Sequence, residues 1–185
     1  MNRFKFICGF NATIWLLSFF YAMSFYLLRL SSVTFALSSV IVILLSYITL
    51  LLYWLYVAHL SKKASWQMSL ASTFGIISCI SLFSLNLYML IGEDFSLDLQ
   101  FYSLTISHIF ESIAFLLLIK YFQSFQKIAL VFVVIFSMCR IFLNILFYFT
   151  EYRFNLVYDS INIAYPLSFG IFFISLLKLK SNREE

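Results

Sequence analysis

Six long apolar runs constrain the fold of this chain more than any other feature. Each contains close to or more than the roughly 20 residues that a helix needs to cross the hydrocarbon core of a bilayer. The runs do not alternate between apolar and polar residues as barrel strands would, and backbone groups in lipid must be hydrogen-bonded within the protein. The sequence therefore predicts an all-α, polytopic integral membrane protein with six transmembrane helices, over residues 6–28, 33–58, 68–91, 101–119, 128–149 and 156–177.

The composition supports this class and excludes others. The chain is 63% hydrophobic and only 11% charged, which is far from the composition of ordinary soluble domains. Its formal net charge of +4 comes mainly from basic residues at the ends of the apolar runs, so we expect a lipid bilayer as partner and no nucleic acid. The breaks between runs are too short for a soluble domain, and residues 1–185 are predicted to form a single membrane domain.

Bulky side chains dominate the predicted helices. The chain has 24 Phe and 12 Tyr but only 4 Gly and 1 Pro, whereas close-packed membrane helices are rich in small residues. We expect these rings to face lipid, and those near span ends, such as Tyr53 and Trp54, to lie in the interfacial belts. Ala71 and Gly75 form one small-xxx-small pair on the third run, although the low glycine content argues against tight helix association.

Basic residues in the short flanks predict the orientation. If the N-terminus is cytoplasmic, only two of the flanking basic residues, Arg29 and Arg153, lie on the outer side. The remaining flanking basic residues then lie on the cytoplasmic side, where positive charge is enriched in membrane proteins. The first run is too long for the apolar region of a signal peptide and is expected to be retained. We predict a protein of the bacterial inner membrane with both termini cytoplasmic. The cytoplasmic basic residues are Arg3, Lys5, Lys62, Lys63, Lys120, Lys127, Lys178, Lys180 and Arg183.

Ionisable and amide side chains gather in the last three runs. Within each run they follow helical spacing, so each predicted helix has one polar face. Lipid penalises any polar side chain that faces outward, and the three faces are therefore expected to converge on one interior. The faces comprise Ser107, His108, Glu111 and Ser112 on the fourth run, Ser137, Arg140 and Asn144 on the fifth, and Asn155, Asp159, Asn162 and Pro166 on the sixth.

Arg140 is the residue that most needs a partner. A charged arginine at the centre of a bilayer costs about 3 kcal/mol on insertion scales, which makes an intramembrane charge a functional-site hypothesis. At a rise of about 1.5 Å per residue, Glu111 and Arg140 lie at similar depths, so we predict a charge-assisted pair between them. In the leading hypothesis Arg140 anchors a small anionic ligand, and Glu111 with His108 responds to protons.

The other polar residues of these faces are predicted to form the entrance to the site. Asp159, Asn144 and Asn162 are expected between the outer surface and the charged pair, as an outward-opening vestibule. Pro166 lacks an N–H and so leaves the carbonyl of Asn162 without its helical partner. The predicted function is the binding or passage of a small ligand or of protons between the fourth, fifth and sixth spans, in the outer half of the bilayer.

Another class of function fits the same residues. Glu111 and Arg140 can be a structural pair that fixes helix register, in a non-catalytic accessory subunit of a larger membrane complex. The scattered cysteines and the distant histidines indicate neither a disulfide nor a metal or haem site. The sequence contains no P-loop, G-x-G-x-x-G, G-x-S-x-G or H-E-x-x-H motif. We therefore expect no cofactor and favour a non-enzymatic role.

The order of polar residues in the last three runs also resembles that of the exosortases and archaeosortases. The resemblance consists of a polar residue in the fourth run, Arg140-Ile141 in the fifth, and an ionisable residue after the next short loop. Those families imply a Cys, Arg and His set in a membrane-embedded transferase or peptidase. Here Glu111 or Ser112 stands near the expected Cys and Asp159 near the expected His, so the resemblance implies a shared, non-catalytic layout.

Overall fold

The computed structural model describes residues 3–28, 33–61, 65–91, 97–150 and 155–178, and the described elements are all helical. Six of them are long and apolar enough to span a membrane, which confirms the predicted all-α, six-span class. Several helices extend up to about one turn beyond the predicted runs, because polar residues near a span end can continue a helix. The elements are α1 (Arg3–Leu28), α2 (Val33–Ser61), α3 (Trp66–Ile91), α4 (Leu97–Leu118), the 3₁₀ turn η1 (Ile119–Tyr121), α5 (Ser124–Thr150) and α6 (Asn155–Leu177).

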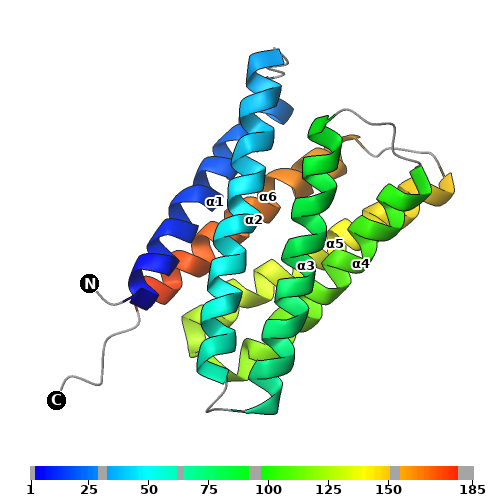
Figure 1. The fold of residues 1–185 in the computed structure, drawn as a ribbon. Coiled ribbons are helices and arrows are strands. Elements are labelled where there is room, and N and C mark those ends of the chain that lie inside the picture. Colours follow the sequence, from blue (N-terminus) through cyan, green and yellow to red (C-terminus); the bar gives the residue numbers. More distant parts are fainter. Residues whose placement is uncertain (1–2, 29–32, 62–64, 92–96, 151–154, 179–185) are drawn as a thin grey trace.

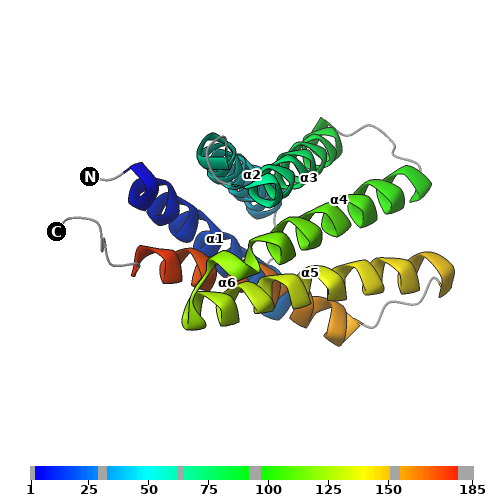
Figure 2. The same cartoon turned by 90° about the horizontal axis from the view of Figure 1, so that it is seen from below.

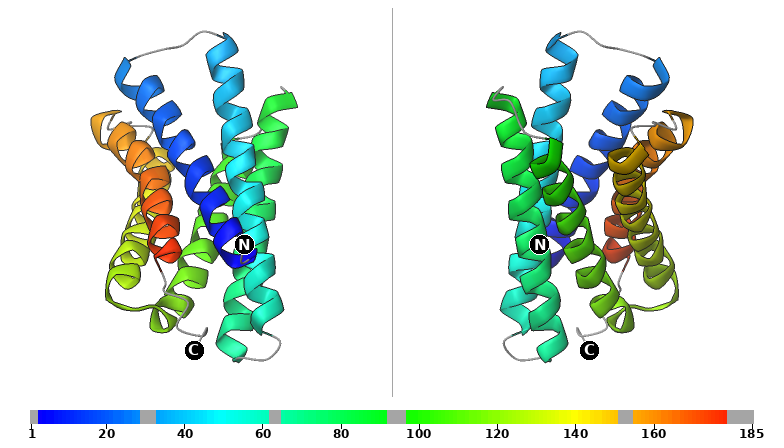
Figure 3. Two further views of the ribbon diagram at one scale, coloured as in Figure 1. Left: turned by 90° about the vertical axis from the view of Figure 1, so that its left-hand side faces the viewer. Right: turned by 90° about the vertical axis from the view of Figure 1, so that its right-hand side faces the viewer.

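The six helices form a closed ring (Figures 1 and 2). Each packs against its neighbours along the chain, and α6 packs against α1 to complete the circle. The start of α1 and the end of α6 lie together, at the same end of the bundle as the end of α2 and the start of α5 (Figure 1). At the other end α1 and α2 spread apart, as the side views in Figure 3 show.

Aromatic rings fill much of the interior of this ring of helices. Trp15 stacks on Phe169 with ring centroids 4.3 Å apart and meets Tyr165 and Tyr47 edge-on. The prediction that the aromatic bulk faces lipid is therefore wrong for the rings that fill the core. Each helix backbone closely approaches only its two neighbours in the ring. Wide side chains are therefore needed to fill the space that the ring of helices encloses. The buried rings include Trp15, Tyr47, Tyr53, Trp54, Phe115, Tyr165, Phe169, Phe172 and Phe173.

Trp54 and Gly75 show how the one small-xxx-small pair is used. Both Trp54 and its neighbour Tyr53 are buried in the core, which corrects the prediction that they lie in an interfacial belt. A Cβ atom on Gly75 would lie 2.2 Å from two ring atoms of Trp54. Because Gly75 has no side chain, the indole of Trp54 on α2 packs directly against α3. The small residue thus serves packing between two helices of the same chain.

Candidate functional site

Glu111 is the centre of a buried polar cluster formed by three helices. Its side chain is 1% exposed, and it accepts hydrogen bonds from α5 and α6. The hydroxyl of Tyr165 lies 2.8 Å from both carboxylate oxygens, and the hydroxyl of Ser137 donates to Oε2 at 2.9 Å. His108, one turn before Glu111 on α4, places Nδ1 3.1 Å from the same Oε2. Each carboxyl oxygen thus has a hydrogen-bond partner, as a buried polar group requires.

The predicted polar face of α4 lies in the interior as a unit. Ser107, His108, Glu111 and Ser112 are each at most 2% exposed. Helical spacing places these residues on one side of α4, and lipid would penalise them on the other side. The geometry therefore agrees with the convergence that the spacing indicated for this helix.

Arg140 reaches Glu111 through Tyr165 and not by direct contact. Its guanidinium carbon lies 4.4 Å from the centroid of the Tyr165 ring, in a cation–π arrangement. Among the residues that the structure describes, no ion pair within 4.0 Å joins Arg140 to Glu111. The predicted direct pair is thus replaced by a three-part arrangement. A phenol hydroxyl that donates to a carboxylate enriches its ring in electrons, which favours a cation on the face of that ring.

Sequence reasoning missed Tyr165 because a tyrosine in an apolar run counts as part of the apolar background. Its position nevertheless carried a signal. Tyr165 follows Asn162 by three residues and immediately precedes Pro166, so it belongs to the polar face of α6. The phenols of Tyr47 and Tyr158 are further neighbours of the Arg140 guanidinium, and Tyr47 comes from α2, outside the helices that the sequence singled out.

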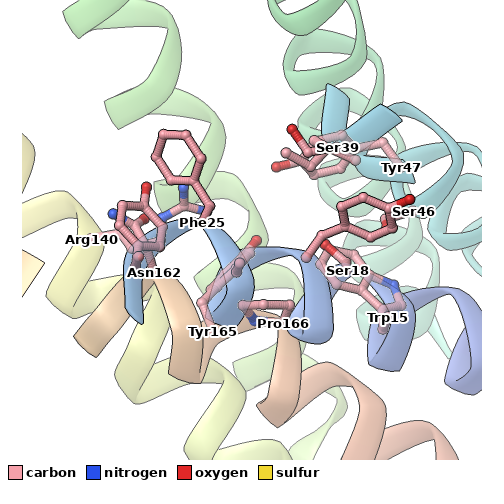
Figure 4. A pocket seen from close by; sticks show the side chains of 14 residues that line it. Trp15, Ser18, Phe25, Ser39, Ser46, Tyr47, Arg140, Asn162, Tyr165 and Pro166 are labelled. Atoms are coloured by element: carbon pink, nitrogen blue, oxygen red, sulfur yellow. The ribbon is translucent and has the colours of Figure 1, made fainter. Parts of the chain in front are cut away.

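The main cavity beside Arg140 lies between α1, α2, α5 and α6. It has a volume of about 220 Å³, and Figure 4 shows Arg140 and Asn162 on one side of it and Trp15, Ser18, Ser46 and Tyr47 on the other. The predicted location between α4, α5 and α6 omitted α1 and α2, which supply most of its wall. The lining residues are Trp15, Ser18, Tyr21, Ala22, Phe25, Tyr26, Ser39, Ile43, Ser46, Tyr47, Arg140, Asn162, Tyr165 and Pro166.

Two smaller cavities occupy the predicted position between α4, α5 and α6. A cavity of about 30 Å³ is lined by Leu104, His108, Arg140, Leu143, Asn144, Tyr158 and Asn162. A second, of about 100 Å³, shares Leu104, Asn144 and Tyr158 with it. Arg140 and Asn162 line both the main cavity and the 30 Å³ cavity, so they form the partition between them. Asp159 is partly exposed and is not one of the residues that line these three cavities.

These features define a class of protein: a six-helix membrane protein in which a buried glutamate and tyrosine adjoin an arginine that lines a cavity between α1, α2, α5 and α6. No protein family, no curated protein and no solved structure matches the chain. Groups of three or more His, Cys, Asp or Glu that could hold a metal ion are absent from the described residues. We therefore infer the function of this protein from the geometry of the site.

Removal of the Tyr165 hydroxyl tests the link between Glu111 and Arg140. We expect Tyr165→Phe to lower the free energy of unfolding by about 1.5 kcal/mol, the lower end for a hydrogen bond to a charged group, because the ring that carries Arg140 remains. Unfolding in lipid bicelles measures this. Tyr158→Phe is the matched control, since Tyr158 is a further neighbour of Arg140 but no hydrogen bond joins it to Glu111. Equal losses in the two variants would contradict the assigned role of Tyr165.

Proposed function

We propose that this protein binds a compact organic anion in the main cavity, with Arg140 as the anchor of its charged group. The observation that carries the proposal is the position of the Arg140 guanidinium on the cavity wall, resting on an aromatic ring and not on a carboxylate. A guanidinium is charged at every accessible pH. In surroundings of low dielectric constant it attracts an anion far more strongly than it does in water.

The cavity wall indicates the size and chemistry of the ligand. An engineered apolar cavity of about 150 Å³ holds benzene, so a cavity of about 220 Å³ accommodates one ring with a charged substituent. Rings of Trp15, Tyr47 and Tyr165 line one part of the wall, and the hydroxyls of Ser18 and Ser46 add hydrogen-bonding groups. Asn162, whose carbonyl Pro166 leaves without its helical donor, belongs to the same wall. A small aromatic carboxylate fits this combination of rings, hydroxyls and one cation.

We further propose that the ligand enters from the outer side of a bacterial inner membrane. Basic residues at the start of α1, in η1, in the first turn of α5 and at the end of α6 support a cytoplasmic location of both termini. The cavity is lined by the second half of α1 and the first half of α2, which lie towards the opposite end of the bundle (Figure 3). Glu111 and His108, behind Arg140, are the groups through which protons would affect binding.

Binding of para-nitrobenzoate tests this proposal. The nitroaromatic group quenches indole fluorescence, and Trp15 lines the cavity, so a titration of the protein in lipid nanodiscs reports occupancy. We expect para-nitrobenzoate to bind at least about tenfold more tightly than the neutral para-nitrobenzamide, a difference of about 1.4 kcal/mol. Arg140→Gln is expected to abolish this preference, and Arg140→Lys to restore part of it, since a lysine keeps the charge but not the planar fork.

Arg3→Gln is the matched control, because Arg3 is an exposed arginine in the first turn of α1. It should leave the preference for the anion unchanged. Trp15→Phe should remove most of the quenching while equilibrium dialysis still detects binding. Equal affinities for the carboxylate and the amide in the parent protein would overturn the proposal and favour a purely structural role for Arg140.

A further inference from the structure

We propose a second, smaller site: the 30 Å³ cavity between α4, α5 and α6 binds a single chloride ion together with a proton on His108. The site lies on the other side of Arg140 from the main cavity; it shares Arg140 and Asn162 with that cavity, and its other lining residues are its own. It does not depend on the organic anion proposed above.

The volume of this cavity restricts its occupant. One water molecule needs at least about 10–15 Å³ of cavity volume, so a cavity of about 30 Å³ holds two or three atoms of that size. A phosphate group is too large for this volume, whereas a chloride ion, which is larger than a water molecule but is a single atom, fits it. Size therefore favours water or a monatomic ion as the occupant.

The polar groups around the cavity favour an anion. Arg140 supplies permanent positive charge, and both Nδ2 of Asn162 and Nε2 of His108 lack a hydrogen-bond partner in the described part of the chain. A buried polar group without a partner costs about 1–3 kcal/mol. An occupant of the cavity would relieve this cost. No carboxylate belongs to the lining, which consists otherwise of Leu104, Leu143, Asn144 and Tyr158.

His108 connects anion binding to proton binding. Its Nδ1 faces Oε2 of Glu111 at 3.1 Å, which leaves Nε2 on the other side of the ring. When the imidazole is charged, both nitrogens donate, one to Glu111 and the other to an anion. His108 is 0% exposed, so the positive charge that such a proton adds lies within the bundle.

The charges of the cluster make this coupling favourable. The groups that face His108 are Glu111 of α4, Arg140 of α5 and Tyr165 of α6, with Tyr158 beside the same cavity and Cys79 of α3 near Glu111. With a neutral imidazole, the positive charge of Arg140 and the negative charge of an ionised Glu111 balance each other. A chloride ion would leave one uncompensated negative charge, which is costly in a low-dielectric interior. A proton on His108 restores the balance, so the two ions bind as a pair.

Chloride binding at several pH values tests the proposal. Chlorine NMR line broadening measures the affinity of the protein in nanodiscs, with sulfate as the background anion. As the pH rises and His108 loses its proton, we expect the dissociation constant for chloride to rise by up to about tenfold per pH unit. His108→Gln should weaken binding and remove the pH dependence. The control is His59→Gln, because His59 is an exposed histidine in the last turn of α2. It should leave the affinity for chloride and its pH dependence unchanged.

Two variants separate this site from the main cavity. Asn144→Leu should fill the small cavity and abolish chloride binding while para-nitrobenzoate still binds, because Asn144 does not line the main cavity. Ser18→Leu should fill the main cavity and abolish binding of para-nitrobenzoate while chloride still binds, because Ser18 does not line the small cavity. Absence of chloride binding at acidic pH in the parent protein would show that the cavity holds only water and would overturn the proposal. Binding that does not depend on pH would overturn the coupling to His108.

Discussion

Glu111→Ala is expected to lower the free energy of unfolding by about 3–5 kcal/mol, the range for removing one partner of a buried charged cluster. The carboxylate accepts hydrogen bonds from Ser137 and Tyr165 and faces Nδ1 of His108. Without it, two hydroxyls and an imidazole remain buried without partners, and Arg140 loses the negative charge behind the Tyr165 ring. Unfolding in lipid bicelles, followed by circular dichroism, measures the loss.

Asp98 offers a matched control for this prediction. It is an exposed carboxylate that accepts a hydrogen bond from Tyr148 at 2.5 Å, so it makes the same kind of contact near the end of a span. Asp98→Ala is expected to cost less than about 1 kcal/mol, because exposed interactions of charged groups contribute little. A loss of this small size for Glu111→Ala would mean that Glu111 is not the centre of the cluster.

Gly75→Ala is expected to cost about 3 kcal/mol, the upper end for overpacking of a tightly filled core. An alanine in a helix is normally favoured over glycine by about 1 kcal/mol. At Gly75 the steric term is larger, because the added Cβ would lie 2.2 Å from ring atoms of Trp54. Trp54 is fully buried between Tyr53 and Phe115, so its indole cannot move aside without disturbing both.

Gly9→Ala is the matched control for overpacking. The nearest atom to a Cβ on Gly9 is Cδ2 of Leu177 at 3.9 Å, an ordinary van der Waals contact. We expect this variant to be as stable as the parent or slightly more stable, because alanine favours the helix. Thermal unfolding of the two variants in the same detergent compares them directly. Equal stability of both would show that Trp54 can be repositioned at little cost.

Polar residues were the most informative part of the sequence about the interior. Ser107, His108, Glu111 and Ser112 could be assigned to one inward face, because lipid makes the outward position of such residues costly. The spacing of polar residues also indicated that Asn144 and Asn162 lie near Arg140, and the three line one cavity. This spacing could not identify which donors satisfy Glu111, because the choice among side chains depends on the rotation and height of neighbouring helices.

Apolar and aromatic residues gave far less information. In water, the apolar face of a helix points to the core, but in lipid both the core and the surroundings are apolar. Periodicity could therefore not tell that Trp15 and Tyr47 face inward. For this reason the sequence did not predict the α1 and α2 wall of the main cavity.

The sequence by itself determined the six helices and the inward polar face of α4, because length and hydropathy are properties of each segment alone. The tertiary structure decided that Tyr165 stands between Glu111 and Arg140, that aromatic rings fill the ring of helices, and that Arg140 separates two cavities. These outcomes depend on which side chains meet across different helices. The energy of such contacts is set by distances of a few ångströms between segments far apart in the chain, which no local pattern contains.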